Sequence, residues 1–127
     1  MSEPAFLGFE QILILHERSL RAYGGTSGIR DEGLVRSAVH QPRNDYFYGG
    51  ADLFGIAAGY AFHLAQAQAF LDGNKRTAIA AASTFLVGNG VPTKTSTEPL
   101  YDAMIAIAEK RMTKIELAQL FRDLFAR

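Results

Sequence analysis

The stretch HLAQAQAFLDGNKRTAIAAASTFL, residues 63–86, decides the fold that we predict for this chain. Two alanine-rich apolar segments flank a short polar turn at 72–77. The chain is apolar nearly all round from Leu53 to about Ala69, and a helix with that pattern is buried on every side. We therefore predict two central helices, Leu53 to about Ala69 and about Asn74 to Val87, with Gly73 allowing the tight bend between them.

Amphipathic helices are expected before this central pair. Apolar residues recur at intervals of three and four from Phe9 to Tyr23, which is the spacing of one helix face, and two glycines follow. A second helix should begin after Asp31, which is a good N-cap, and should end at Pro42, because proline interrupts helices. The aromatic stretch 43–50 is then expected to be a loop closed by glycines.

Two further helices are expected after the central pair. Ser96 or Thr97 should cap the first of them, and Thr113 with Glu116 forms a capping box before the last. The sequence thus predicts an all-α, compact bundle of about six helices in a single domain over 1–127. A short strand pair between 6–7 and 91–95 is the one β-element that we consider.

Composition excludes several classes of protein. The chain of 127 residues has no cysteine, which excludes disulfides, thiolate zinc sites and cysteine nucleophiles. Its formal net charge of +0 argues against a strongly basic surface for nucleic acid or for a membrane. No run of about 18 apolar residues suggests a membrane span, and the N-terminus lacks the pattern of a signal peptide. A cytoplasmic protein with no membrane contact and no direct nucleic-acid contact is expected.

The polar turn allows two interpretations. It could be a surface turn whose lysine and arginine are simply solvated. Alternatively, the unpaired N–H groups at the start of the second central helix could bind phosphate, with Lys75 and Arg76 adding charge. Two adjacent cations at a helix N-terminus oppose the helix dipole, which favours an anion nearby. Asp72, on the other side of Gly73, could then anchor Mg²⁺, which needs only one or two protein ligands beside phosphates.

These residues resemble the motif of the Fic/Doc family, His-x-Phe-x-(Asp or Glu)-(Gly or Ala)-Asn. Here the run is QAFLDGNKRT, from Gln68 to Thr77. Lys75 stands where Fic members carry a second glycine, and Ile79 stands where their closing arginine would be, so the resemblance is to the Doc toxins. The segment 23–44, YGGTSGIRDEGLVRSAVHQPRN, also resembles the family's N-terminal part. The similarity covers nearly the whole chain and implies a single domain with the Fic-like helical fold.

The resemblance implies a function and a set of site residues. Doc members are toxins of type II toxin–antitoxin systems that use ATP to phosphorylate a protein hydroxyl group, in a translation elongation factor, and so arrest growth. Their partner is a small antitoxin whose disordered tail folds on the toxin. Asp72 would bind Mg²⁺, and the backbone amides from Gly73 to Arg76 would form an anion hole. The residues implied to contact the nucleotide are Gly73, Asn74, Lys75, Arg76 and Thr77. The aromatic stretch 43–50 resembles the family's target-positioning flap, although its Tyr46, Phe47 and Tyr48 could equally be packing residues of a loop.

Gln68 departs from the motif, because the family has its catalytic histidine there. A glutamine amide cannot act as a general base, a role worth about 10²–10⁴-fold in rate. Three explanations are considered: a deliberately inactivated variant, a natural member that only binds, and substitution by another group. We favour the first, because the rest of the motif is intact. His63 lies about 140° around an ideal helix from Gln68, which disfavours direct replacement.

The other polar residues singled out have structural interpretations. His16 is expected in or beside the core, His40 at the surface, and Arg30 in a structural ion pair. The alternatives to a phosphotransferase are a Fic-type AMP-transferase, which Lys75 disfavours, and a binding module without catalysis.

Overall fold

The computed structural model describes residues 3–94 and 98–126 of the chain. This part contains six helices, which confirms the predicted all-α fold. Their bounds are α1 Phe9–Tyr23, α2 Glu32–Gly49, α3 Leu53–Ala67, α4 Asn74–Gly88, α5 Glu98–Ala108 and α6 Lys114–Phe125. Extended pairing in the described part is confined to an isolated antiparallel bridge between Ile29 and Phe70. The strand pair considered for 6–7 and 91–95 is absent from its described residues, where the Asn89 side chain instead bonds the backbone of Ala5.

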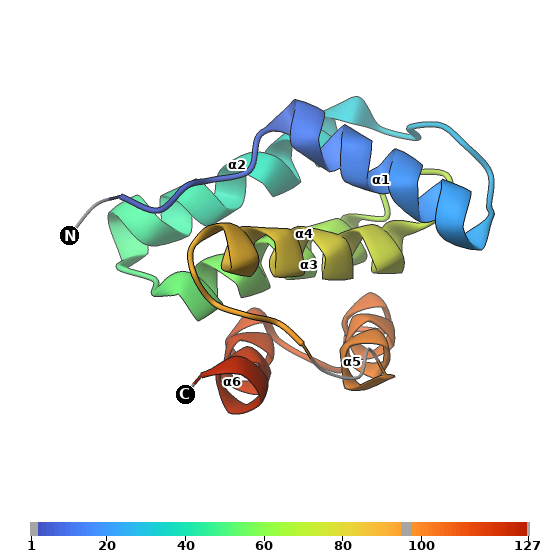
Figure 1. The fold of residues 1–127 in the computed structure, drawn as a ribbon. Coiled ribbons are helices and arrows are strands. Elements are labelled where there is room, and N and C mark those ends of the chain that lie inside the picture. Colours follow the sequence, from blue (N-terminus) through green and yellow to red (C-terminus); the bar gives the residue numbers. More distant parts are fainter. Residues whose placement is uncertain (1–2, 95–97, 127) are drawn as a thin grey trace.

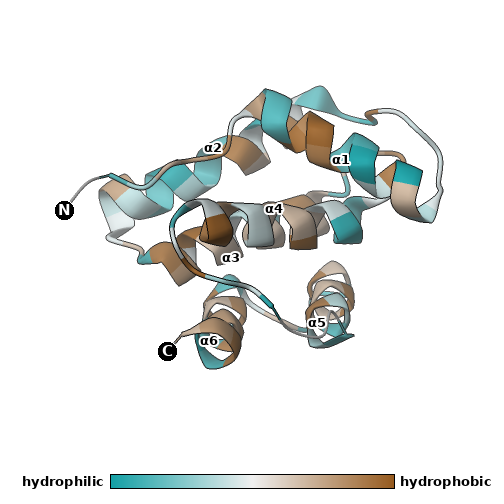
Figure 2. Cartoon of the chain, viewed as in Figure 1, coloured by the Kyte–Doolittle hydropathy of each residue, from teal (hydrophilic) through white to brown (hydrophobic). Residues whose placement is uncertain are grey.

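The helices form three layers, with α3 and α4 in the middle, α1 and α2 on one side and α5 and α6 on the other (Figure 1). Alanine and glycine are small, so they let the two central helices pack closely. The fully buried alanines of these helices include Ala57, Ala61, Ala65, Ala78 and Ala81. Figure 2 shows teal and brown alternating along α1, as in an amphipathic helix, whereas the central helix α3 is mostly white to brown. None of the described helices is long and apolar enough to cross a membrane.

Helix α2 corrects one prediction, because it continues through Pro42 and includes most of the stretch expected to be a loop. Proline in a helix interior costs about 3 kcal/mol in isolation, so packing must compensate. Pro42 is buried against Gly59 of α3, where a Cβ atom would lie only 3.3 Å from the proline Cγ. Tyr46 and Phe47 pack on the Phe6 ring, each with centroids 5.8 Å apart. Tertiary packing therefore overrides the local proline signal.

This correction also moves the aromatic stretch 43–50 away from the polar turn. Tyr46 lines a surface cavity with Asn89, which follows the C-terminal end of α4. The polar turn lies at the N-terminal end of α4, about 22 Å away along a 15-residue helix. The resemblance to a target-positioning flap therefore stays a prediction, which this position does not favour.

The predicted helix caps in the described residues are confirmed. The Asp31 carboxylate accepts a hydrogen bond from the Leu34 N–H at 3.1 Å and caps α2. The Thr113 hydroxyl and the Glu116 carboxylate form the reciprocal capping box of α6. The cap predicted at Ser96 or Thr97 lies outside the described residues.

Candidate active site

The polar turn is held in place by the loop that joins α1 to α2. The N–H groups of Arg30 and Asp31 both donate to the Ala69 carbonyl, at 2.7 and 3.0 Å, and the Leu71 N–H donates to the Gly28 carbonyl. The Arg30 guanidinium also donates to the carbonyl of Gln68, which ends α3 with a left-handed φ of 49°. Arg30 therefore has a structural role and fixes the backbone that presents Gln68, but its partner is a carbonyl group, and the predicted ion pair of Arg30 is not found among the described residues.

A second set of contacts holds the turn from the core side. The Asn74 side chain accepts from the Phe70 N–H and donates to the Phe70 carbonyl, both at 3.0 Å. The Phe70 ring is buried and stacks on His16 with centroids 3.8 Å apart. The His16 Nε2 atom in turn lies 2.8 Å from the Asp72 carbonyl oxygen. Both ends of the turn are therefore tied to buried side chains, as a preorganised site requires.

The Asp72 carboxylate lies at the opening of the turn. One oxygen accepts from the Thr26 N–H at 3.0 Å, and the other accepts from the Gly73 N–H at 2.9 Å. These hydrogen bonds, first that from Thr26, lower the pKa of Asp72 below its ordinary value. Gly25 packs directly against the carboxylate, since a Cβ atom there would lie 2.8 Å from the nearer oxygen. Asp72 is thus an oriented anion at neutral pH.

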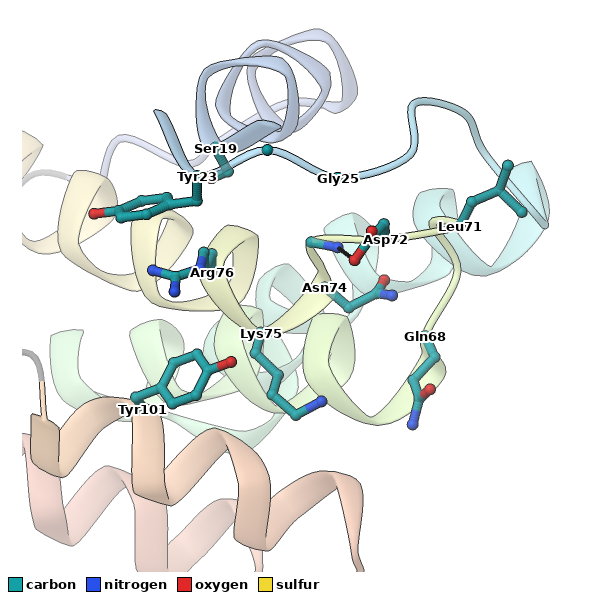
Figure 3. A pocket seen from close by; sticks show the side chains of 12 residues that line it. Ser19, Tyr23, Gly25, Gln68, Leu71, Asp72, Asn74, Lys75, Arg76 and Tyr101 are labelled. Atoms are coloured by element: carbon teal, nitrogen blue, oxygen red, sulfur yellow. Dashed lines mark hydrogen bonds between the residues drawn. The ribbon is translucent and has the colours of Figure 1, made fainter. Parts of the chain in front are cut away.

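Across the turn, helix α4 presents a positive end. Its first backbone hydrogen bond runs from the Thr77 N–H to the Gly73 carbonyl, and no side chain among the described residues caps the preceding N–H groups. Lys75 and Arg76 lie in this first turn and line the same cavity as Asp72 and Gln68, and Figure 3 shows the Arg76 guanidinium on the side of Tyr23 and Tyr101. Unpaired amides and two cations together can bind a polyanion.

These groups surround a cavity of about 440 Å³. Its lining residues are Ser19, Tyr23, Gly24, Gly25, Gln68, Leu71, Asp72, Gly73, Asn74, Lys75, Arg76 and Tyr101. The volume is in the range of small-molecule sites. The lining combines one carboxylate with two cations and an uncapped helix start, which is the arrangement expected for a metal-bound polyphosphate.

Comparison with known proteins identifies the family. A sequence model of the Fic/DOC family matches residues 6–86, which include the turn, α3 and all but the last two residues of α4. The chain belongs to the Fic/Doc family. It is 32% identical over 117 residues to "Protein kinase doc" of Escherichia phage P1, covering 91% of this chain and 92% of that protein. It is 46% identical over 74 residues to "Toxin Doc" of Mycolicibacterium smegmatis, covering 55% of each chain. Both relatives confirm the predicted resemblance to Doc members.

The structure brings most of the predicted Fic/Doc site residues together. Gln68, Asp72, Gly73, Lys75 and Arg76 all line the cavity. Asn74 lines it as well, but its side-chain amide is engaged by the Phe70 backbone, so its evident role is to shape the turn.

Thr77 is not brought to the cavity. Its side chain is fully buried, and its hydroxyl oxygen has no hydrogen-bond partner in the described part of the chain. On a helix, Thr77 faces a different direction from Lys75 and Arg76, which the motif alone does not reveal. Its implied contact with nucleotide stays a prediction that this geometry does not favour.

Several lining residues were missed at the sequence level. Ser19 and Tyr23 come from α1, Gly24 and Gly25 from the loop after it, and Tyr101 from α5. The segment beginning at Tyr23 resembles the family, but nothing in its pattern shows that it contacts the turn. Tyr101 carried no signal at all, because its position depends on how α5 packs on α4.

The three histidines lie where the sequence placed them, away from the catalytic position. His16 is buried behind the turn, and His40 is exposed on α2. His63 lies beside Lys114, with 3.5 Å between the two side-chain nitrogens, and Lys114 pairs with Asp45. Burial, and then the Lys114 charge, lowers the pKa of His63. None of the three lines the described cavity.

The residues present fit Mg²⁺ only as a metal shared with bound phosphates. Among the described residues, no group of three or more histidine, cysteine or carboxylate side chains is arranged so that it could hold a metal ion. Asp72 is a single ionised carboxylate whose oxygens retain lone pairs beyond the two hydrogen bonds that they accept. Mg²⁺ usually keeps several waters and takes one or two carboxylates plus phosphate oxygens. This donor set matches that preference and would not hold a metal by itself.

Proposed function

We propose that this Fic/Doc protein is a Doc-type toxin that transfers the γ-phosphoryl group of ATP to a hydroxyl group of a protein, with transfer impaired by Gln68. The observation that carries the proposal is the convergence of Asp72, Lys75, Arg76 and the uncapped start of α4 on one cavity. The two similar proteins, one named a kinase and the other a toxin, support it.

The proposed roles follow from the positions of the side chains. The N–H groups at the start of α4 and the Lys75 and Arg76 side chains would bind the polyphosphate, Arg76 by its forked donors and Lys75 as a point charge. Asp72 would hold Mg²⁺, which when bound neutralises developing charge on the phosphate oxygens. In the transfer, a bond forms between the target hydroxyl oxygen and the γ-phosphorus. The bond from that phosphorus to the bridging oxygen breaks, ADP leaves, and the hydroxyl proton must pass to a base.

Position 68 is where that base would act. Gln68 is exposed at the edge of the cavity, and its amide has no useful basicity. A histidine there would meet little backbone resistance, because histidine is enriched several-fold among non-glycine residues with left-handed φ. His16 is engaged behind the turn and His63 lies near α6, so neither supplies the missing group. Binding without efficient transfer is therefore expected of the chain as it stands, and a purely binding role is the second candidate function.

The test compares the chain with Gln68→His and with Gln68→Asn. Asparagine also tolerates a left-handed backbone but supplies no base, so it is the matched control. Each protein is incubated with ATP, Mg²⁺ and a bacterial translation elongation factor, and the intact mass of the factor is measured. We expect added phosphate with Gln68→His, at a rate about 10²–10⁴-fold above the other two proteins. Added AMP would instead establish the nucleotidyl-transfer alternative.

Growth of expressing cells gives the second measurement. Arrest only with Gln68→His supports the toxin proposal and assigns the impairment to position 68. Absence of both transfer and arrest with Gln68→His, while ATP still binds, would leave the binding module as the function. The elongation-factor target, the antitoxin with a disordered tail and a cytoplasmic location belong to the same proposal and derive from the family resemblance.

A further inference from the structure

The Arg76 side chain is stacked between two tyrosines from different helices. Its guanidinium carbon lies 3.7 Å from the ring centroid of Tyr23 at the end of α1, and 5.3 Å from that of Tyr101 on α5. Both distances are within the range in which a cation is attracted by an aromatic face. Figure 3 shows the guanidinium near both rings at one side of the cavity.

The same three side chains line two neighbouring cavities. Besides the cavity of about 440 Å³ at the polar turn, they line a second one of about 370 Å³, together with residues such as Ile79 and Ala80 further along α4. Arg76 therefore stands at the boundary between the two spaces. An arginine at such a boundary has many rotamers available unless something holds its planar group.

We propose that Tyr23 and Tyr101 are positioning residues that hold the Arg76 guanidinium at the polyphosphate cavity, so that affinity for a triphosphate depends on α1 and α5 as well as on the motif. This inference rests on the proposed function. The interaction uses the ring faces, because the guanidinium carbon lies over the ring centroids. Phenylalanine should therefore replace tyrosine without loss, whereas leucine should not, because it lacks the ring quadrupole.

A first measurement needs no ligand. The Arg76 Nε–Hε resonance is located by NMR in the unaltered chain and in Tyr23→Phe and Tyr23→Leu. A stacked guanidinium experiences the ring current, so we expect this resonance to be displaced in the unaltered chain and in Tyr23→Phe, and to move towards the solvated position in Tyr23→Leu. Tyr23 is 65% exposed at a helix end, so the chain should fold with any of these residues.

The second measurement is the affinity for inorganic tripolyphosphate by calorimetry. We expect Tyr23→Phe to match the unaltered chain and Tyr23→Leu to bind about two- to fivefold more weakly. In an Arg76→Ala background, Tyr23→Leu should cause no further loss, because the group that the ring positions is gone. Tyr48→Leu, at a tyrosine that is 88% exposed on α2, is the matched control and should leave the affinity unchanged.

The outcomes separate this inference from the function on which it rests. If Tyr23→Leu binds as tightly as the unaltered chain, or loses affinity equally with Arg76 absent, the positioning role is refuted and the proposed function stands. If the unaltered chain does not bind tripolyphosphate, both fall together. Repeating the series with Tyr101→Phe and Tyr101→Leu tests the second ring by the same criteria.

Discussion

The contact between Gly25 and Asp72 leads to the sharpest prediction. Gly25 has a φ of +127°, and a Cβ atom there would lie 2.8 Å from an Asp72 carboxylate oxygen and 3.0 Å from a Leu20 methyl carbon. Gly24, the neighbouring residue, also has a positive φ, +80°, but a Cβ atom there would meet nothing within 4 Å. Gly25→Ala therefore adds strain and a clash, whereas Gly24→Ala adds strain alone.

The expected magnitudes follow from these two terms. Forcing alanine into a backbone conformation reserved for glycine costs about 1–3 kcal/mol. For a chain of this length that corresponds to a fall of roughly 3–15 °C in melting temperature for either variant. Only Gly25→Ala also displaces the carboxylate and weakens its hydrogen bond from the Thr26 N–H. Because that bond is the main cause of the lowered pKa of Asp72, the pKa should rise towards its ordinary value.

Three measurements check this reasoning. Thermal unfolding gives the strain, a ¹³C NMR titration of the Asp72 carboxyl gives its pKa, and calorimetry gives the affinity for Mg²⁺ with ATP. We expect both variants to be destabilised, but only Gly25→Ala to raise the pKa and weaken binding. A pKa of Asp72 that stays lowered and an unchanged affinity in Gly25→Ala, or an equal change in Gly24→Ala, would refute the claim that Gly25 sets the position of the carboxylate.

Three further predictions concern stability. Asn74→Ala removes both side-chain hydrogen bonds to the Phe70 backbone and should lower the free energy of unfolding by about 1–3 kcal/mol. An unchanged midpoint in denaturant unfolding would contradict the role of Asn74 in holding the turn. Thr77→Val removes a buried hydroxyl without a partner and should stabilise by about 1 kcal/mol while leaving ATP affinity unchanged, whereas weaker binding would restore Thr77 to the site. The pKa of His63 is lowered in the folded state, so its protonation opposes folding. Stability should fall as the pH drops below the unfolded pKa of about 6.5, and His63→Gln should flatten that part of the profile.

The sequence alone determined the helical bundle, the two central helices and the chemistry of the turn. These depend on local patterns: apolar periodicity, Gly73 at the bend, the capping residues and a contiguous motif from Gln68 to Arg76. Such signals are complete within a few residues of the chain, so they can be read without knowing what packs against them.

Tertiary structure alone decided what surrounds that turn. The path of α2 through Pro42 depends on packing against Gly59, and the direction of Thr77 depends on which face of α4 is buried. The contributions of Gly25 and Tyr101 come from segments 47 residues before and 29 residues after Asp72. Contacts between segments so far apart are created by packing of the folded chain, and no local pattern encodes them.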